Sequence, residues 1–174
     1  MKLRLFFQRN REAVLFCIKF LVFLVVFQML VTDTLLGSWL NLWKPFAEWS
    51  ARISAFVLSV LGWETKTYGS VLVYKTLSVN VSKGCDGLTA SAIFVAAVLA
   101  FRASWRAKLL GSALGFLAIQ IVNVLRIMIL FLTLVYFPKL FENMHVFIMQ
   151  SLVIAFSIIL WFYWAQKYAK ASPR

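Results

Sequence analysis

Long runs of apolar residues, separated by short segments rich in Lys and Arg, limit most strongly how this chain can fold. Four runs, at residues 13–31, 88–105, 109–137 and 146–164, approach or exceed the ~20 residues with which a helix crosses the hydrocarbon core of a bilayer. Hydrophobic residues make up 63% of the 174 residues, against ~45–50% in soluble domains. We therefore expect one all-α polytopic membrane domain, residues 1–174, with four transmembrane helices.

The first apolar run follows a basic N-terminal segment, as does the apolar core of a secretory signal peptide. The residues after the run are Thr32, Asp33 and Thr34, which do not form the small-residue cleavage site that such a peptide carries. This pattern predicts an uncleaved membrane anchor.

The basic residues predict the orientation of the chain. The net charge of +12 would indicate a nucleic-acid partner in a soluble protein, but here the charges lie between apolar runs. In that position they determine topology and contact anionic membrane lipids, so we expect no nucleic-acid partner. With four spans and both termini in the cytoplasm, ten basic residues lie on cytoplasmic segments and six on outer segments. This distribution satisfies the positive-inside rule.

Residues 39–63 have a different pattern, with one apolar stripe rich in Trp at helical spacing. Lys44, Glu48 and Arg52 lie off the stripe. A fifth span here would place the basic loop at 102–108 outside, against the positive-inside rule. We therefore expect an amphipathic helix lying in the membrane interface. The stripe comprises Trp39, Leu42, Trp43, Phe46, Trp49, Ile53, Phe56, Val57, Val60 and Leu61.

The outer segment at 64–84 shows the alternation of a strand. Leu77, Val79 and Val81 are separated by polar residues, and Val71 and Val73 indicate a partner strand. The pattern predicts a small periplasmic β-hairpin, which must pack on another element because two strands alone are marginally stable.

The third run contains one charged side chain and two amide side chains, and such groups are costly inside a membrane. Arg126 lies 17 residues after Leu109, about 25 Å along a helix and near the outer surface. Asn123 and Gln120 precede it by three and six residues and form a polar stripe on neighbouring faces. Hydrogen bonding between helices explains Gln120 well and Asn123 in part, but it does not require the full charge of Arg126. Lys19, in the first run, can extend to the cytoplasmic face.

Cys85 and His145 join Arg126 at the same outer level. Cys85 begins the second run, where a helix N-terminus favours the thiolate, and Gly84 and Gly87 beside it permit close approach of a substrate backbone. His145, the only histidine, begins the fourth run. A thiol, an imidazole and a guanidinium on three segments predict a nucleophilic site in which His145 takes the thiol proton.

The second cysteine, Cys17, lies near the cytoplasmic end of the first run, so it cannot form a disulfide with Cys85 and is a small apolar filler. The sequence contains no metal-ligand cluster and no phosphate loop, so we expect no metal and no cofactor. Attack by Cys85 requires a lowered thiol pKa, for which the helix N-terminus and Arg126 are the available causes.

These motifs resemble those of the exosortase/archaeosortase family of multi-pass transpeptidase-like enzymes. The resemblance rests on residues 84–88 (Gly-Cys-Asp-Gly-Leu), on Asn123 and Arg126 in an Asn-x-x-Arg motif, and on His145. It extends from about residue 69 to residue 164 and is closest to the short subgroup called exosortase H. Two positions depart from the pattern: Arg102 stands where that subgroup has Pro, and Asp86 stands where related sequences often have Ser or Asn.

The resemblance implies a function and a location. Substrates of this family are exported proteins with a C-terminal sorting signal, made of a short motif, a transmembrane helix and a basic tail. For the exosortase H subgroup the motif resembles Ile-Pro-Thr-Leu-x-x-Trp-Gly. Cleavage outside the bacterial inner membrane would form a thioester on Cys85, and transfer to a surface acceptor would follow. Arg126 would stabilise an oxyanion or hold a carboxylate, and Asn123, Gln120, Gly84, Asp86 and Gly87 would support the site or bind substrate.

Two alternatives keep the fold and change the chemistry. In the first, Arg126 binds a lipid phosphate and the protein is a non-catalytic assembly or lipid-binding factor. In the second, Cys85 serves an acyltransferase that acts on a lipid. A sorting-signal protease is distinguished from both by the presence of tail-bearing substrates.

Overall fold

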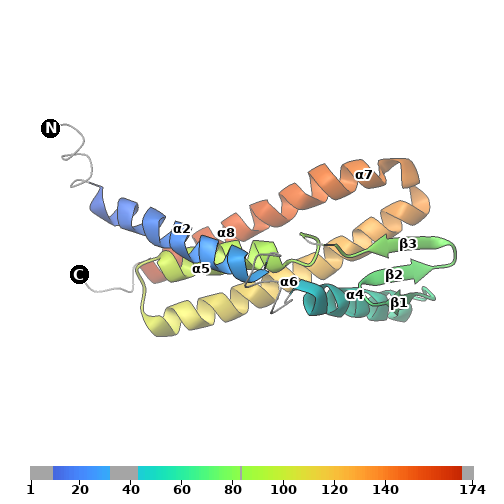
Figure 1. Cartoon of the computed structure of the whole chain (residues 1–174), viewed down its shortest axis with the longest axis horizontal. Coiled ribbons are helices and arrows are strands. Elements are labelled where there is room, and N and C mark those ends of the chain that lie inside the picture. The colour runs from blue at the N-terminus through green and yellow to red at the C-terminus, as the bar shows by residue number, and fades with distance from the viewer. Residues whose placement is uncertain (1–9, 32–42, 83, 170–174) are drawn as a thin grey trace.

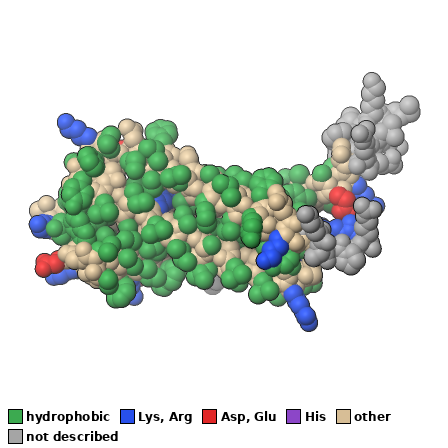
Figure 2. Space-filling view, turned by 180° about the vertical axis from the view of Figure 1, so that it is seen from behind, with side chains coloured by type: hydrophobic (Ala, Val, Ile, Leu, Met, Phe, Trp, Pro, Cys, Tyr) green, Lys and Arg blue, Asp and Glu red, His purple; other side chains and the backbone are tan. Residues whose placement is uncertain are grey.

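The computed structural model describes residues 10–31, 43–82 and 84–169. Within these residues, three helical stretches are long and apolar enough to cross a membrane, namely Arg11–Val31, Trp105–Tyr136 and Pro138–Tyr168. Figure 2 shows flanks covered mostly by hydrophobic side chains, with Lys, Arg, Asp and Glu gathered mainly toward the two ends of the molecule. This is the architecture of a polytopic membrane protein. The predicted start of the amphipathic helix, at 39–42, lies outside the described residues.

The long helix α6 (Trp105–Tyr136) extends through both halves of the molecule and holds them together (Figure 1). In the half that contains α2 (Arg11–Val31), α6 packs with α5 (Leu88–Ala100), and α5 in turn packs with α2. In the other half it packs with α4 (Trp43–Val60) and a small β-sheet. The last helix, α8 (Gln150–Ala169), returns along α6 toward the end where the chain begins.

The connection between α6 and α8 is helical from Pro138 onward. It consists of a 3-10 turn (Pro138–Leu140), a short α-helix, α7 (Phe141–Asn143), and a π-helix (Met144–Met149) that leads into α8. The fourth apolar run is therefore part of a longer helical stretch than the predicted 146–164.

The second predicted span, 88–105, is shorter than expected. Helix α5 ends at Ala100, because Phe101 adopts an extended conformation and Ser104 caps α6 by accepting a hydrogen bond from the N–H of Ala107 at 3.4 Å. Thirteen residues rise only about 20 Å, less than the ~30 Å of the hydrocarbon core. The first and third spans agree closely with the predicted 13–31 and 109–137, although α6 begins four residues earlier.

Helix α4 differs from the predicted interfacial helix in its orientation. It runs beside α6 along the long axis of the molecule (Figure 1). Its buried face is formed by small residues and Leu58, and part of the apolar stripe points outward, with Phe56 68% and Val60 71% exposed. Small residues allow two helix backbones to approach closely, which favours packing on α6. The buried residues are Ala47, Ser50, Ala51, Ser54, Ala55 and Leu58.

The segment after α4 forms a three-stranded antiparallel sheet in the order β1 (Lys66–Tyr68), β2 (Val71–Tyr74), β3 (Leu77–Asn80). The predicted pairing of the last two strands is present, with Leu72 opposite Val79, and β1 adds a strand that the alternation did not reveal. Leu72 and Val79 are buried in a core with Leu58, Met128 and Phe131. The sheet is thus stabilised by packing on α4 and α6.

Two glycines allow the other helices to approach α6 closely. A Cβ atom at Gly115 would lie 2.0 Å from the ring of Phe94 on α5, and one at Gly111 would lie 2.1 Å from the ring of Trp164 on α8. Both rings belong to one core cluster that also contains Val98. The two glycines therefore set the distances from α6 to α5 and α8.

Gly115→Ala should destabilise the protein by about 1–3 kcal/mol, because the added methyl group overpacks a fixed ring. The measurement is the thermal unfolding midpoint in detergent. Ala113→Leu adds a larger side chain on an exposed position of the same helix and should leave the midpoint nearly unchanged. Equal midpoints for Gly115→Ala and the wild type would contradict the close α5–α6 contact.

Candidate active site

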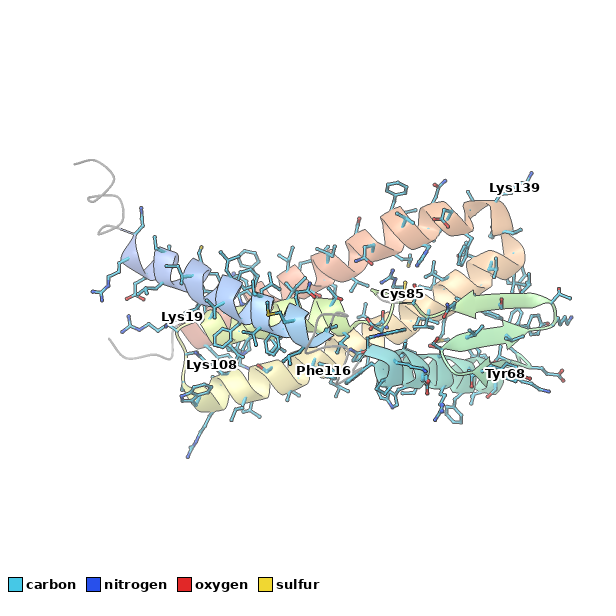
Figure 3. The ribbon with its side chains drawn as sticks, in the orientation of Figure 1. Lys19, Tyr68, Cys85, Lys108, Phe116 and Lys139 are labelled. Carbon is cyan, nitrogen blue, oxygen red and sulfur yellow. The ribbon has the colours of Figure 1, made fainter. Side chains whose placement is uncertain are left out.

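Cys85 lies in the short loop between β3 and α5, near the middle of the molecule (Figure 3). The backbone N–H of Cys85 donates to the carbonyl of Ser82 at 3.0 Å, and Gly84 turns the chain with a φ of 84°. The Cys85 side chain is 7% exposed and shares a cluster with Ala47 and Ala51 of α4. The small-residue face of α4 therefore forms one wall of the site.

Helix α6 holds the loop by its backbone. Asn123 donates through Nδ2 to the carbonyl of Cys85 at 3.0 Å, and Arg126 donates through Nη1 to the carbonyl of Gly84 at 3.2 Å. The two side chains, three residues apart, lie on the same face of the helix. Asn123 is fully buried and Arg126 is 4% exposed. The Asn-x-x-Arg spacing thus matches the spacing of two successive carbonyl groups.

Gly87 and Asp86 set the start of α5. A Cβ atom at Gly87, whose φ is 71°, would lie 3.0 Å from atoms of both Asn123 and Gln120, so only glycine fits this position. The carboxylate of Asp86 accepts a hydrogen bond from the N–H of Leu88 at 3.0 Å. We expected the glycines to admit a substrate. At Gly87 the space is used instead by α6, whereas a Cβ at Gly84 would meet no atom within 4 Å.

His145 reaches the thiol from the π-helix that precedes α8. Its Nε2 lies 2.8 Å from Sγ of Cys85. Phe141 stacks on the imidazole with ring centroids 5.8 Å apart and 25° between the planes. A π-helix alters the helical register, and such segments are frequent at functional sites. Glu142 and Asn143, close to His145 in the sequence, are both exposed, and neither has a hydrogen bond to it among the described residues.

Arg126 completes the group, with Nη2 3.4 Å from Sγ of Cys85. The expectation of a lowered thiol pKa is wrong for this resting state. Burial raises the pKa of Cys85, and the nearby charge of Asp86 raises it further, while Arg126 and a hydrogen bond with Ser82 oppose the shift. Burial also raises the pKa of Asp86, against backbone N–H groups and Arg126. The thiol is therefore neutral, with His145 placed to accept its proton.

The site lies close to one boundary of the apolar region. Eighteen residues of α6 separate Lys108 from Arg126, about 27 Å along the helix axis. This is nearly the thickness of a hydrocarbon core. The turn beyond the far end of α6 carries Lys139 and Glu142, which favours the position of that end outside the hydrocarbon.

The structure therefore brings Cys85, Arg126 and His145 together, with Asn123, Gly84, Asp86 and Gly87 around them. Gln120 does not bond to these residues directly. Its Nε2 donates to Oγ of Ser91 on α5 at 3.3 Å and so joins α5 to α6. Phe141 was not predicted, although its position four residues before His145 on a helix is a signal for contact. Cys17 is a free, exposed thiol on α2. Among the described residues, no group of His, Cys, Asp and Glu could hold a metal ion.

Cys85 should react with iodoacetamide at a rate that rises steeply from about pH 7 to about pH 10, since only the thiolate reacts and burial raises the thiol pKa. The rate is measured by intact mass in a Cys17→Ser background. Arg126→Gln removes the main charge that lowers the pKa and should shift the profile to higher pH. Asp86→Asn should shift it to lower pH. A flat profile that is already maximal at neutral pH would contradict a neutral resting thiol.

Comparison with known proteins supports the family inferred from the motifs. The chain matches a protein-family model described as transmembrane exosortase (Exosortase_EpsH) over residues 5–169. No curated protein and no solved structure matches the chain. The matched region includes every residue of the site, and it covers nearly the whole chain. The chain therefore belongs to the transmembrane exosortase family.

Proposed function

We propose that this protein is a membrane cysteine transpeptidase or protease that cleaves the C-terminal sorting signal of exported proteins and transfers them to a surface acceptor. The observation that carries the proposal is the 2.8 Å contact between Sγ of Cys85 and Nε2 of His145 in a chain of the exosortase family. Its place of action is the periplasmic face of the bacterial inner membrane, with both termini in the cytoplasm.

The proposed reaction begins with proton transfer from the Cys85 thiol to Nε2 of His145. Sγ attacks the carbonyl carbon of the scissile peptide bond and gives a tetrahedral oxyanion. His145 then gives the proton to the leaving amine as the C–N bond breaks, which leaves a thioester on Cys85. An acceptor amine or water attacks the thioester, loses its proton to His145, and the thiol is restored.

Arg126 is the donor best placed for the oxyanion. The N–H of Cys85, which would serve in many cysteine proteases, is already bonded to Ser82. Nε of Arg126 is buried and has no hydrogen-bond partner among the described residues, while its Nη2 contacts Sγ. The guanidinium therefore has an unused N–H group that can donate to the oxyanion when it forms beside the thiol.

The position of the site suits a substrate with a single transmembrane helix. Such a substrate can lie beside the apolar flanks of the molecule, so that its motif reaches the boundary where Cys85 lies. The basic tail would then lie at the end that carries Arg102, Arg106 and Lys108, on the cytoplasmic side by the positive-inside rule.

Co-expression with a tail-bearing candidate substrate tests the proposal. Wild type should remove the tail, and Cys85→Ala should lower cleavage by about 10³-fold or more, since the nucleophile is lost. His145→Ala should lower it by about 10²–10⁴-fold. Intact mass of the released substrate identifies the new C-terminus and the acceptor. Cys17→Ala is the matched thiol control and should cleave normally.

Two outcomes would contradict the proposal. Normal cleavage by Cys85→Ala would exclude this thiol as the nucleophile. Failure of properly inserted wild type to cut several tailed candidates would favour the lipid-binding alternative.

The variant Arg126→Lys should also fail to cleave the substrate efficiently. Lys lacks the planar guanidinium that contacts the Gly84 carbonyl and the thiol at the same time. We expect cleavage to fall by about 10²–10³-fold, the loss typical of one oxyanion donor. The rate of cleavage is followed by gel shift of the substrate. Near-normal turnover would mean that only the positive charge is required.

A further inference from the structure

A cavity apart from the thiol lies toward the end of the molecule where Figure 3 labels Lys19 and Lys108. We call it the basic pocket; its volume is about 650 Å³. It is formed by the start of α2, the turn after α5, the start of α6 and Trp161 of α8. Its lining residues are Arg11, Glu12, Ala13, Leu15, Phe16, Lys19, Ala100, Phe101, Arg102, Ala103, Lys108 and Trp161.

The basic pocket carries four basic side chains and one acidic one. Glu12 accepts from Nη1 of Arg102 at 2.9 Å, but both side chains are more than 70% exposed, so this ion pair is weak and can exchange partners. Nζ of Lys108 donates to the carbonyl of Leu99 at 2.7 Å. Among the described lining residues, positive charges therefore outnumber the negative charge by three. Its charge is complementary to an anion.

An apolar groove of about 300 Å³ continues from the basic pocket along α2, α5 and α8. Phe16 and Trp161 line both cavities, and their rings lie 5.7 Å apart. Nε1 of Trp161 is buried and lacks a hydrogen-bond acceptor among the described residues. The other residues of the groove are Phe20, Ala90, Ile93, Phe94, Ala97, Ile154, Ser157, Ile158 and Phe162.

We infer that the basic pocket and the groove together bind one anionic phospholipid. The phosphate lies among Lys19, Arg102 and Lys108, and an acyl chain fills the groove. Basic pockets between transmembrane helices are known to select anionic headgroups.

The chemistry of the two cavities favours this occupant over a polypeptide. An apolar helix with a basic flank would bring further positive charge into the basic pocket, where it would be repelled. A zwitterionic lipid would fill the groove but would leave the excess positive charge of the basic pocket unmatched. Only a ligand that is anionic at one end and apolar over its length satisfies both cavities.

Native mass spectrometry of the full chain in detergent tests the inference, with phosphatidylglycerol and phosphatidylcholine of identical acyl chains as probes. Phosphatidylglycerol should bind at least about ten-fold more tightly. Lys19→Ala and Arg102→Ala should each weaken it about five-fold, since one basic residue near an anionic headgroup contributes about 1 kcal/mol. Arg106→Ala is the matched control, because Arg106 is exposed at the same end and does not line the pocket.

Ala97→Phe tests the groove separately, since its ring would occupy the space of the acyl chain while leaving every charge in place. It should weaken phosphatidylglycerol binding by about ten-fold or more, with an unchanged unfolding midpoint in lipid-free detergent. Equal retention of the two lipids, or equal losses for Arg106→Ala and Lys19→Ala, would overturn the anionic site. Unchanged binding by Ala97→Phe would show that the acyl chain does not lie in the groove.

Discussion

The structure depends on two hydrogen bonds that α6 donates to the backbone of an irregular loop. Helix α5 is too short to cross the hydrocarbon, and residues 84–87 just before it are not helical. Irregular backbone beside the hydrocarbon is tolerated only where protein groups satisfy its polar atoms. Asn123 and Arg126 bind the carbonyls of Cys85 and Gly84, and Asp86 binds the N–H of Leu88. The loop that carries the thiol is thus fixed by the same side chains that make its burial possible.

The close packing of this loop against its neighbours explains why several residues around the site are small. Gly87 lets the loop touch Asn123, and the alanines of α4 let that helix close over Cys85. Gly111 and Gly115 keep α8 and α5 close to α6 at the other end. Because α6 contacts every one of these elements, a shift in its position would disturb both the packing and the site. Helix α6 therefore positions both the other helices and the residues of the candidate site.

Residue chemistry and membrane thickness were sufficient to predict where most of the site lies. The depth of Arg126 along its helix and the starts of two apolar runs indicated that Cys85, Arg126 and His145 meet, because all spans share one hydrocarbon thickness. Hydropathy did not reveal that α5 stops at Ala100, since the boundary is set by the cap of Ser104 and not by polarity. The face of α4 that packs on α6 consists mainly of Ala and Ser, which give a weak hydropathy signal. Hydropathy therefore revealed only the large apolar residues of the helix, and these predicted an interfacial position.

The thiol pKa could not be predicted because it depends on burial, which the linear sequence does not contain. A helix N-terminus and a nearby Arg126 both favour a thiolate, yet desolvation of Cys85 outweighs them. In the proposed mechanism this is an advantage, since a neutral buried thiol resists oxidation and reacts only when His145 takes its proton. The same enclosure limits the access of water to the thioester. An acceptor that is held at the site then competes better with hydrolysis, which is the condition that distinguishes transfer from simple proteolysis.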